Sequence, residues 1–436
     1  MSQVANERSE NVFEDYKAPM SGAQAVVEAN RCLYCEDAPC ITACPTGINI
    51  PEFIRKIATG NVKGSAKTIF ESNILGMSCA RVCPVEVLCV GDCVYNHMDS
   101  PPIEIGKLQR YATDQAFEKD WRYFEAGADT GKSVGLVGGG PASIACAHEL
   151  RRLGHACTIY ESRDVLGGLN TTGVAPYKMR ADRSVEEINW VLEIGGIDIK
   201  TGVKVGQDVS WQELEDKHDA LFVGMGLGPD RWLEIAGKEL EGVYGAVDFI
   251  EQMKLGSVQT DKVNRAIVVG GGNTAIDAVR ELRGLGIENV SMVYRRNEAT
   301  MSGYSHEWKA AKLAGATGNW FAQPAGFVGD EDGRVTGLRC NRLDAERNPV
   351  PDGEFVAQAD LILLAIGQSK LGDLVAALDG VELDWGKVVT DEHGATGRPG
   401  IYAGGDCTNG GKEVVNAVAE GRDAARAIDR YIQGGK

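Results

Sequence analysis

The sequence lacks the features that would place the chain in a membrane or outside the cell. No apolar run reaches the length of a membrane-spanning helix, and the first thirty residues are polar and acidic, without the apolar core of a signal peptide. We therefore expect a cytoplasmic protein, in which thiols stay reduced and disulfides are rare. The chain also has no block of lysine or arginine and carries a formal net charge of −17, so we expect neither nucleic acid nor a membrane as partner.

The chain is instead marked by cysteines that are unevenly distributed along it. Eight of its 12 cysteines lie between residues 32 and 93, and the other four are scattered through the glycine-rich remainder of the 436 residues. In a reducing compartment the clustered thiols predict a metal site, whereas the scattered ones are expected to be small buried apolar residues. The length allows two or three domains, and the cysteines mark off the first of them.

Hydrophobic periodicity predicts a small helical domain around these cysteines. Residues 21–32 carry apolar side chains at helical spacing, and residues 51–73 contain two short amphipathic helices joined at Gly60–Asn61. A further helix is expected from about Pro101–Pro102 through IEIGKLQRYATDQAF, whereas residues 1–20 are expected to form a mobile polar tail. A domain this small and rich in loops needs bound metal to supply what its core lacks.

The cysteine spacing favours iron–sulfur clusters over zinc. Zinc sites commonly use paired C-x2-C units, but only one such unit occurs here, at Cys32 and Cys35. The first run continues as C-x4-C-x3-C-P, and the second is C-x3-C-x5-C-x3-C with a proline after its second cysteine. Compact runs of four cysteines that end in Cys-Pro are typical of ferredoxins. Eight cysteines also match the ligand count of two [4Fe–4S] clusters.

After Gly131 the pattern changes to that of nucleotide-binding α/β domains. The segment SVGLVGGGPAS is an apolar strand followed by glycines, then a helix and the second strand CTIYE. RAIVVGGGNTAIDAVRELRGLG and NVSMVYRR repeat this plan further along the chain. Two copies of one βαβ unit predict two doubly wound domains, and hence an α/β fold for this part of the chain.

The first glycine motif, Gly138-x-Gly140-x-x-Ser143, follows a strand and opens a helix, as a dinucleotide site requires. Its glycines let the backbone approach a pyrophosphate at the positive end of the helix. Glu161 ends the second strand, where a carboxylate binds a ribose hydroxyl.

In the second motif, Gly270-x-Gly272-x-x-Ala275, the second strand ends in Arg295 and Arg296 instead of an acid. Arginine at this place suits a 2′-phosphate and favours NADPH over NADH. The alternative is that both arginines are simply solvated.

Further motifs resemble a known flavoprotein architecture. The turn Gly167–Leu169 and the C-terminal AGGD, with Asp406, resemble the FAD half of two-dinucleotide flavoproteins of the glutathione and thioredoxin reductase lineage. That resemblance implies a nicotinamide domain inserted into an FAD domain. The expected domains are a helical iron–sulfur domain (1–127), an FAD domain (128–252 plus 370–436) and an NAD(P)H domain (253–369).

The cysteine region resembles the N-terminal iron–sulfur domain of dihydropyrimidine dehydrogenase and, more distantly, the glutamate synthase small subunit. The segments that carry the resemblance are ANRCLYCEDAPCITACPTGINIPEFI, LGMSCARVCPVEVLCVGDC and IGKLQRYATD. It implies one cluster held by Cys32, Cys35, Cys40 and Cys93, and a second held by Cys44, Cys83, Cys89 and Gln109. Cys79 is then not a ligand. Glutamate synthase small subunits resemble this region with a carboxylate in the place of Gln109.

The same resemblance implies the residues that contact the nucleotides. For FAD they are Gly138, Gly140, Pro141, Ala142, Ser143, Glu161, Gly168, Leu169, Lys178, Val205, Gly405, Asp406 and Val414. For NAD(P)H they are Gly270, Gly272, Asn273, Thr274, Ala275, Arg295, Arg296, Ala365 and Gly367. The chain departs from the family in VAPYKMRAD, around Lys178, and at Ser302, where the family has a third phosphate-binding arginine.

The resemblance extends over residues 25–436 and implies the electron-input subunit of a dihydropyrimidine dehydrogenase. Such a subunit takes hydride from NAD(P)H on FAD and passes single electrons through two [4Fe–4S] clusters. Because the chain ends at Lys436, the pyrimidine site is expected on a partner that carries FMN and iron–sulfur clusters, with a dihydroorotate-dehydrogenase-like barrel and a ferredoxin domain, in a heterotetramer. We expect no catalytic side chain, because the protein only has to hold and tune the cofactors.

Two alternatives remain open at the level of sequence. A glutamate synthase small subunit uses the same electron input to serve a different large subunit. A cluster-carrying interaction module with vestigial nucleotide sites belongs to another class of protein, and the intact glycine motifs argue against it.

Overall fold

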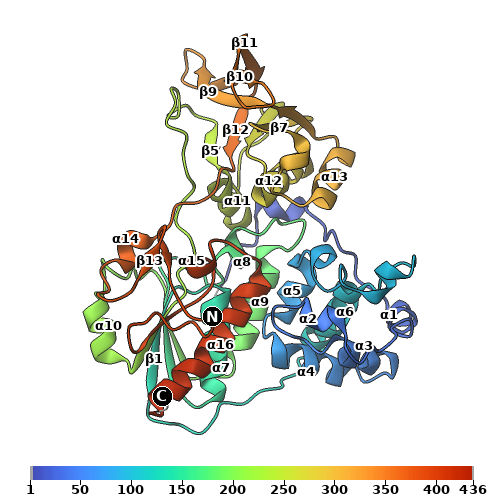
Figure 1. The fold of residues 1–436 in the computed structure, drawn as a ribbon, viewed down its shortest axis with the longest axis vertical. Helices are drawn as coiled ribbons and strands as arrows, with labels where there is room; N and C mark the ends of the chain where they lie inside the picture. The colour runs from blue at the N-terminus through green and yellow to red at the C-terminus, as the bar shows by residue number, and fades with distance from the viewer. Residues whose placement is uncertain (1–2, 435–436) are drawn as a thin grey trace.

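A computed structural model describes residues 3–434, which form a helical domain, an α/β domain and a second α/β domain inserted into the first (Figure 1). This arrangement confirms the predicted fold class. Residues 1–2 and 435–436, at the ends of the expected domains, lie outside the described residues. No helix in the described part of the chain is long and apolar enough to cross a membrane.

The helical domain is built from short helices whose apolar faces meet in one core. Its elements are α1 (Gly22–Ala29), α2 (Pro39–Thr42), α3 (Ile50–Ala58), α4 (Val62–Ser72), α5 (Gly76–Val82), α6 (Ile105–Glu118), and 3₁₀ turns at Val85–Val87 and Val94–His97. As predicted, two helices meet at Gly60, whose φ of +78° suits glycine. The side chain of Asn61 then accepts a hydrogen bond from Gly64 N (2.9 Å) and caps α4. The last helix begins at Ile105, a few residues after the predicted start.

The first α/β domain has a five-stranded parallel sheet in the order β15-β4-β1-β2-β3. Its main elements are β1 (Ser133–Val137), α7 (Pro141–Arg152), β2 (Ala156–Tyr160), α8 (Leu169–Thr172), α9 (Ala181–Leu192), β3 (Ile197–Lys200), α10 (Trp211–Lys217) and β4 (Ala220–Val223). The chain returns to it with α14 (Gly372–Val375), β13 (Leu383–Asp384), β14 (Lys387–Val388), β15 (Ile401–Ala403), α15 (Asp406–Asn409) and α16 (Val414–Ile432). The long helix α16 lies between the sheet and the helical domain (Figure 1).

The inserted domain has a parallel sheet in the order β5-β12-β6-β7-β8. Its elements are β5 (Val243–Gly245), α11 (Ala246–Leu255), β6 (Arg265–Val269), α12 (Asn273–Gly284), β7 (Asn289–Tyr294), a 3₁₀ turn at Glu298–Thr300, α13 (Ser305–Leu313), β8 (Thr317–Trp320) and β12 (Leu361–Leu364). Between β8 and β12 the chain forms an antiparallel sheet of β9 (Ala322–Gly329), β10 (Val335–Leu343) and β11 (Pro349–Gln358), which the sequence patterns did not indicate.

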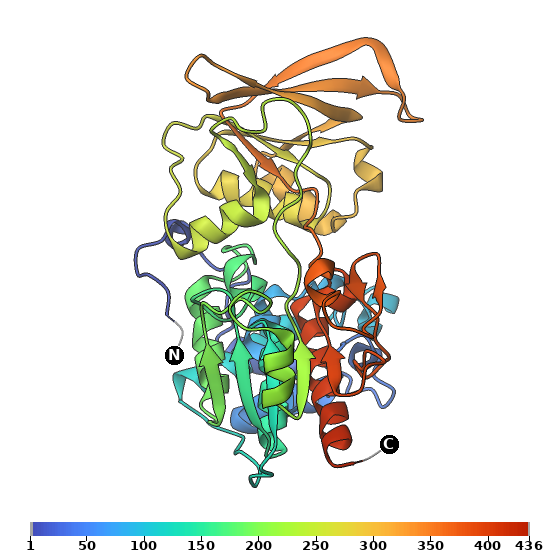
Figure 2. The same cartoon turned by 90° about the vertical axis from the view of Figure 1, so that its left-hand side faces the viewer.

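Two chain segments connect the α/β domains, and they run side by side (Figure 2). Gly228 N donates to Ser369 O (2.9 Å), and Ser369 N donates to Pro229 O (2.8 Å). The expected boundary at 369/370 falls at this link. The expected boundary at 252/253 falls inside the inserted domain instead, because β5 pairs with β12 and the inserted sheet therefore begins at Val243.

The prediction of a mobile tail at residues 1–20 is wrong for its described part. Residues 3–20 form an arm that crosses from the inserted domain to the helical domain (Figure 2). Glu10 is fully buried, and its carboxylate accepts hydrogen bonds from Arg8 Nε (2.7 Å) and Ala181 N (3.0 Å). Phe13 is also buried, against Gly284 of α12. The polar composition suggested a solvated tail, but the polar side chains of the arm pair with one another or with the backbone.

A buried carboxylate of the first α/β domain caps a helix of the helical domain. Glu187 on α9 is fully buried and accepts hydrogen bonds from Met77 N (2.7 Å) and Ser78 N (3.0 Å), in the first turn of α5. Burial raises the pKa of Glu187 to about 7, whereas the two donors favour the carboxylate. The cap fixes the helix that leads into Cys83.

We expect Glu187→Ala to destabilise the protein, because it leaves two buried N–H groups without an acceptor. The expected cost is about 2–5 kcal/mol in the free energy of unfolding, measured by chemical denaturation. Glu186→Ala is the matched control, since Glu186 is exposed and pairs only with Arg183 on the same helix. Equal stability of the two variants would contradict the capping role.

Candidate cofactor and electron-transfer site

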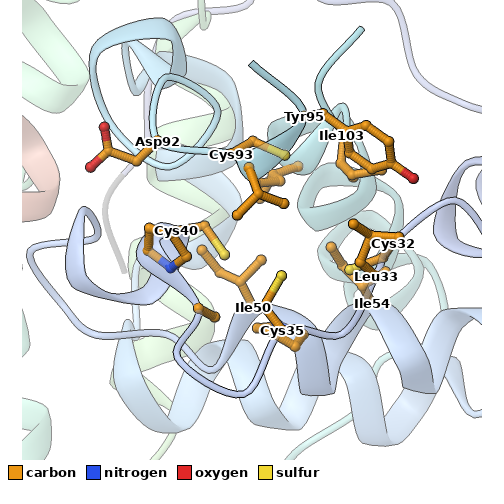
Figure 3. Close-up of a pocket in the computed structure, with 15 residues that line it drawn as sticks. Cys32, Leu33, Cys35, Cys40, Ile50, Ile54, Asp92, Cys93, Tyr95 and Ile103 are labelled. Carbon is orange, nitrogen blue, oxygen red and sulfur yellow. The ribbon is translucent and has the colours of Figure 1, made fainter. Parts of the chain in front are cut away.

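Four cysteines from distant positions surround one cavity in the helical domain (Figure 3). Cys32, Cys35 and Cys40 come from the loop after α1 and from α2, and Cys93 lies across the space from Cys35. The cavity is partly open to solvent, and its other walls are mostly apolar. Cys32, Cys35 and Cys40 are partly exposed, whereas Cys93 is buried.

A second cavity lies beside the first, and its lining includes Cys44, Cys83, Cys89 and Gln109. Ile50 lines both cavities, which makes them neighbours. The structure therefore brings the two predicted ligand sets together, each around its own cavity. Cys79 also lines the second cavity and is buried, so position alone does not separate it from the predicted ligands.

The amide of Gln109 has a defined orientation in the second cavity. Its Nε2 donates to Gly76 O (2.8 Å), and only 8% of the residue is exposed. Because the Gly76 carbonyl requires a donor, the amide oxygen is the atom left for the cavity. With a carboxylate at this position, an oxygen would face the Gly76 carbonyl oxygen, and both atoms can only accept hydrogen bonds.

The donor geometry fits a cluster better than a single ion. Among residues 3–434, no three side chains of His, Cys, Asp or Glu converge on a position that would hold one metal ion. The thiols stand around cavities instead, as ligands of a polynuclear cluster must. Burial raises the pKa of Cys40 to about 12 and also raises that of Cys89, so these thiols need a bound cation to ionise.

The first glycine motif has the geometry of a pyrophosphate site. Gly138 has φ +93°, and a Cβ there would lie 2.6 Å from Gly224 O. No side chain caps α7, which begins with Pro141, Ala142 and Ser143, so its first N–H groups stay available to an anion. Gly140, just before this helix, has open space where its Cβ would be, with no atom nearer than 4.0 Å.

Most other predicted FAD residues surround the same end of the sheet. Glu161 accepts from Gly139 N (2.7 Å), and Gly167 N donates to Gly139 O (2.7 Å), which brings the Gly168–Leu169 turn against Gly140. Gly405 N donates to Glu420 Oε2 (2.6 Å). Burial raises the pKa of Asp406, the first residue of α15, to about 6. Val205 is buried in the core beside β2, and Val414 is the first residue of α16.

Lys178, a predicted FAD contact, forms ion pairs with the inserted domain. Its ammonium pairs with Asp277 (2.9 Å) on α12 and with Glu307 (2.8 Å) on α13, both in the inserted domain. Burial lowers the pKa of Lys178, but the two carboxylates outweigh it and raise the pKa overall. Lys178 therefore links the two α/β domains in this structure.

The second glycine motif repeats the first. Gly270 has φ +148°, and a Cβ there would lie 2.3 Å from the carbonyl of Ala365, at the end of the neighbouring strand β12. Gly272 precedes α12, which begins with Asn273, Thr274 and Ala275 and has no side-chain cap. Gly367 follows Ala365 with φ +98°. Arg295 and Arg296 are exposed after β7, and among the described residues no carboxylate forms an ion pair with either.

Sequence reasoning missed several residues at the borders between domains. Val415 of α16 lines the second cavity, directly after the predicted FAD residue Val414. Tyr304 of the inserted domain donates to Glu413 Oε1 (2.9 Å), just before the same helix. Lys17 of the N-terminal arm donates to Cys83 O (2.8 Å). No motif marks any of them, because each depends on contacts between distant parts of the chain.

Comparison with known families divides the chain as the structure does. A family described as dihydropyrimidine dehydrogenase domain II, 4Fe-4S cluster, matches residues 8–121. A family described as pyridine nucleotide-disulphide oxidoreductase matches residues 132–421. Together with the cavities and glycine motifs, these matches assign FAD, [4Fe–4S] clusters and NAD(P)H as the cofactors.

Similar proteins cover nearly the whole chain. A putative oxidoreductase AegA of Escherichia coli K12 is 34% identical over 99% of this chain and 69% of its own length. The glutamate synthase [NADPH] small chain of the same organism is 31% identical over 97% of this chain and 94% of its own length. The NAD-dependent dihydropyrimidine dehydrogenase subunit PreT, also of E. coli K12, is 32% identical over 98% of both chains.

Solved structures support the two-domain α/β fold. Thioredoxin reductase of T. acidophilum matches 68% of this chain and 98% of its own, with a TM-score of 0.55 at 20% sequence identity.

Proposed function

Since this chain belongs to the pyridine nucleotide-disulphide oxidoreductase family, we propose that it is the electron-input subunit of a dihydropyrimidine dehydrogenase. The family and cofactors make it an NAD(P)H-dependent flavin and iron–sulfur oxidoreductase. Bound FAD supplies the conversion of a hydride from NAD(P)H into single electrons for the clusters. The chain's own residues hold these groups in order, and we propose the predicted ligand sets for the two clusters.

The first turn of α16 supports this order. Val414 is a predicted FAD contact, and its neighbour Val415 lines the second cavity. Ile50 lines both this cavity and the first one. Electrons would therefore pass from the flavin to the cluster at Gln109, and from there to the cluster at Cys93.

The observation that carries the pyrimidine assignment is Gln109 at the second cavity. Its Nε2 is engaged by Gly76 O, which leaves the amide oxygen for the cluster. In the dihydropyrimidine dehydrogenases that the region resembles, a glutamine holds this place, whereas the glutamate synthase small subunits have a carboxylate. A neutral ligand makes the cluster one unit less negative and raises its reduction potential.

The glutamate synthase small chain is the second candidate. The E. coli small chain is 31% identical to this chain over 94% of its own length, and PreT is 32% identical over 98% of its own. Overall identity thus does not separate the two functions. The discriminating feature is the ligand at residue 109.

The proposal includes a partner that completes the reaction. Both groups of relatives are named as a subunit or a small chain. We propose a partner with FMN and iron–sulfur clusters, built on a dihydroorotate-dehydrogenase-like barrel with a ferredoxin domain, which reduces uracil or thymine. The half-exposed cysteines of the first cavity are where electrons would leave this chain.

We propose NADPH as the preferred donor, and Arg295 and Arg296 as the residues that select it. Both guanidinium groups are exposed and free to contact a 2′-phosphate. Arg295→Ala with Arg296→Ala should raise the KM for NADPH about tenfold or more and leave the KM for NADH nearly unchanged. Equal effects on both cofactors in steady-state assays with an artificial electron acceptor would contradict this role.

Co-purification with the partner, followed by NAD(P)H oxidation assays, tests the proposed function. The expected result is turnover with uracil or thymine. Turnover only with 2-oxoglutarate plus glutamine would refute the pyrimidine assignment and support the second candidate. The assay is run once with NADPH and once with NADH, because the preference between these two donors is tested in a separate experiment.

A further inference from the structure

We propose that Lys17, carried by the N-terminal arm, is a fixed positive charge that raises the reduction potential of the cluster at Cys44, Cys83, Cys89 and Gln109. The inference rests on the cluster assignment of the proposed function, but not on the identity of the final acceptor. Lys17 makes no bond to the sulfur of a proposed ligand. It acts through its charge, and contacts of the N-terminal arm hold it in place.

Lys17 contacts a residue that lines the second cavity. Its Nζ donates to the carbonyl of Cys83 (2.8 Å), whose side chain belongs to that lining. Among residues 3–434 no carboxylate forms an ion pair with Lys17, so its charge is not cancelled by a direct partner. The ammonium therefore lies against the backbone of one proposed cluster ligand, Cys83.

The arm is anchored at Lys17 and at the two residues before it. Arg110, next to Gln109 on α6, donates to Lys17 O and pairs with Asp15. Tyr16 N donates to Tyr177 O (2.7 Å), and the guanidinium of Arg280 lies 4.6 Å from the centre of the Tyr16 ring. These contacts place the Lys17 backbone against the helix that carries the Gln109 ligand.

Burial lowers the pKa of Lys17, whereas Cys83 and Glu86 oppose that shift. A bound cluster with three thiolate ligands has a net negative charge, which favours the charged form of the lysine beside Cys83. The positive charge of Lys17, which is not a ligand, then offsets part of the negative charge of the thiolates and the cluster sulfides.

The two cluster sites differ in charge. The first set has four thiolates, and the nearby Arg31 is already held by both oxygens of Glu28 (2.7 and 2.8 Å). The second set has three thiolates, a neutral amide and the charge of Lys17, which forms no ion pair, with the carboxylates of Glu86 and Glu413 as further charges in its surroundings. Both differences favour the reduced, more negative state of the second cluster. We therefore assign the higher reduction potential to the cluster beside the flavin site.

The size of the Lys17 effect follows from Coulomb's law. A unit charge in a buried site acts on the electron added to the cluster more strongly than it would in water. Removal of that charge should change the ratio of reduced to oxidised cluster at least about tenfold at fixed potential. For a one-electron couple, a tenfold change corresponds to about 59 mV.

The test is a redox titration of the purified full-length chain, with both reduced clusters followed by electron paramagnetic resonance. Lys17→Met and Lys17→Gln should shift the second cluster to a more negative midpoint potential and leave the first in place. Lys17→Gln keeps a hydrogen-bond donor for Cys83 O, and Lys17→Arg keeps the charge and should match the wild type. Lys63→Met, an exposed lysine that lines neither cavity, is the control.

Unchanged potentials in Lys17→Met and Lys17→Gln at wild-type iron content would overturn the inference. An equal shift, or equal loss of iron, in Lys17→Arg would also overturn it, because packing and not charge would then be responsible. Loss of the second cluster from the two neutral variants alone would support it. A wild-type chain without clusters would instead refute the proposed function, so the two failures are distinguishable.

Discussion

Cys93→Ser should remove the cluster whose other three ligands lie in the first cysteine run, although Cys93 belongs to the second run. The structure places Cys93 across one cavity from Cys35, together with Cys32 and Cys40. A serine cannot replace a buried thiolate as a soft iron ligand. We expect half of the iron to be lost and one of two paramagnetic signals to disappear, measured by iron analysis and electron paramagnetic resonance.

Cys44→Ser is the reciprocal variant, and it should remove the other cluster while the first persists. Cys79→Ser is the matched control: Cys79 is buried and lines the second cavity, but it is not in the proposed ligand set. It should keep both clusters. Loss of a cluster in Cys79→Ser, or loss of the same signal in Cys44→Ser and Cys93→Ser, would contradict the interlocked ligand sets.

Gly140→Ala should fold normally but lose FAD. The backbone at Gly140 has φ −79°, which any residue adopts, and an added Cβ would find no protein atom nearer than 4.0 Å. The methyl group would instead occupy the space through which the pyrophosphate approaches the helix. Overpacking of this kind costs about 1–3 kcal/mol, so FAD should bind roughly ten- to a hundredfold more weakly, as measured by flavin content and FAD titration.

Gly272→Ala is the matching change in the second motif. Here φ is −97°, and the nearest atom to a new Cβ is Ser302 Oγ at 3.6 Å. This variant should keep its FAD and lose NAD(P)H oxidation through a raised KM. Loss of flavin in Gly272→Ala, or full flavin content in Gly140→Ala, would reverse the assignment of the two sites.

The first glycine of each motif should behave differently from the second. Gly138 and Gly270 have positive φ, and a Cβ would lie 2.6 and 2.3 Å from a backbone oxygen. Alanine at either position strains the free chain as well as the site. The pair Gly140 and Gly272 therefore tests cofactor binding without that complication.

Local patterns predicted the elements that depend on local interactions. The two helices around Gly60 and the strands before each glycine motif are confirmed, and each is encoded by periodicity or by a motif within a short stretch. The insertion of one α/β domain into the other is also confirmed, but the flavoprotein resemblance implied it. The ligand sets came from resemblance, and the structure places each set around its own cavity.

Features that depend on contacts between distant parts of the chain were not predicted from the sequence. The N-terminal arm is polar, and only its contacts with Ala181 and α12 show that Glu10 and Phe13 are buried. The boundary at 252/253 was misplaced because β5 is defined by its pairing with β12. Likewise, the pairing of Lys178 with Asp277 and Glu307 requires both domains in place.

The central claim is that one chain conducts electrons from NAD(P)H through FAD to two iron–sulfur clusters. Anaerobic addition of NAD(P)H to the purified full-length protein tests it directly, with visible absorption and electron paramagnetic resonance recorded together. We predict bleaching of the flavin band and the appearance of a reduced [4Fe–4S] signal. A colourless protein with bound zinc, or flavin and clusters that stay oxidised in the presence of either nucleotide, would contradict the account.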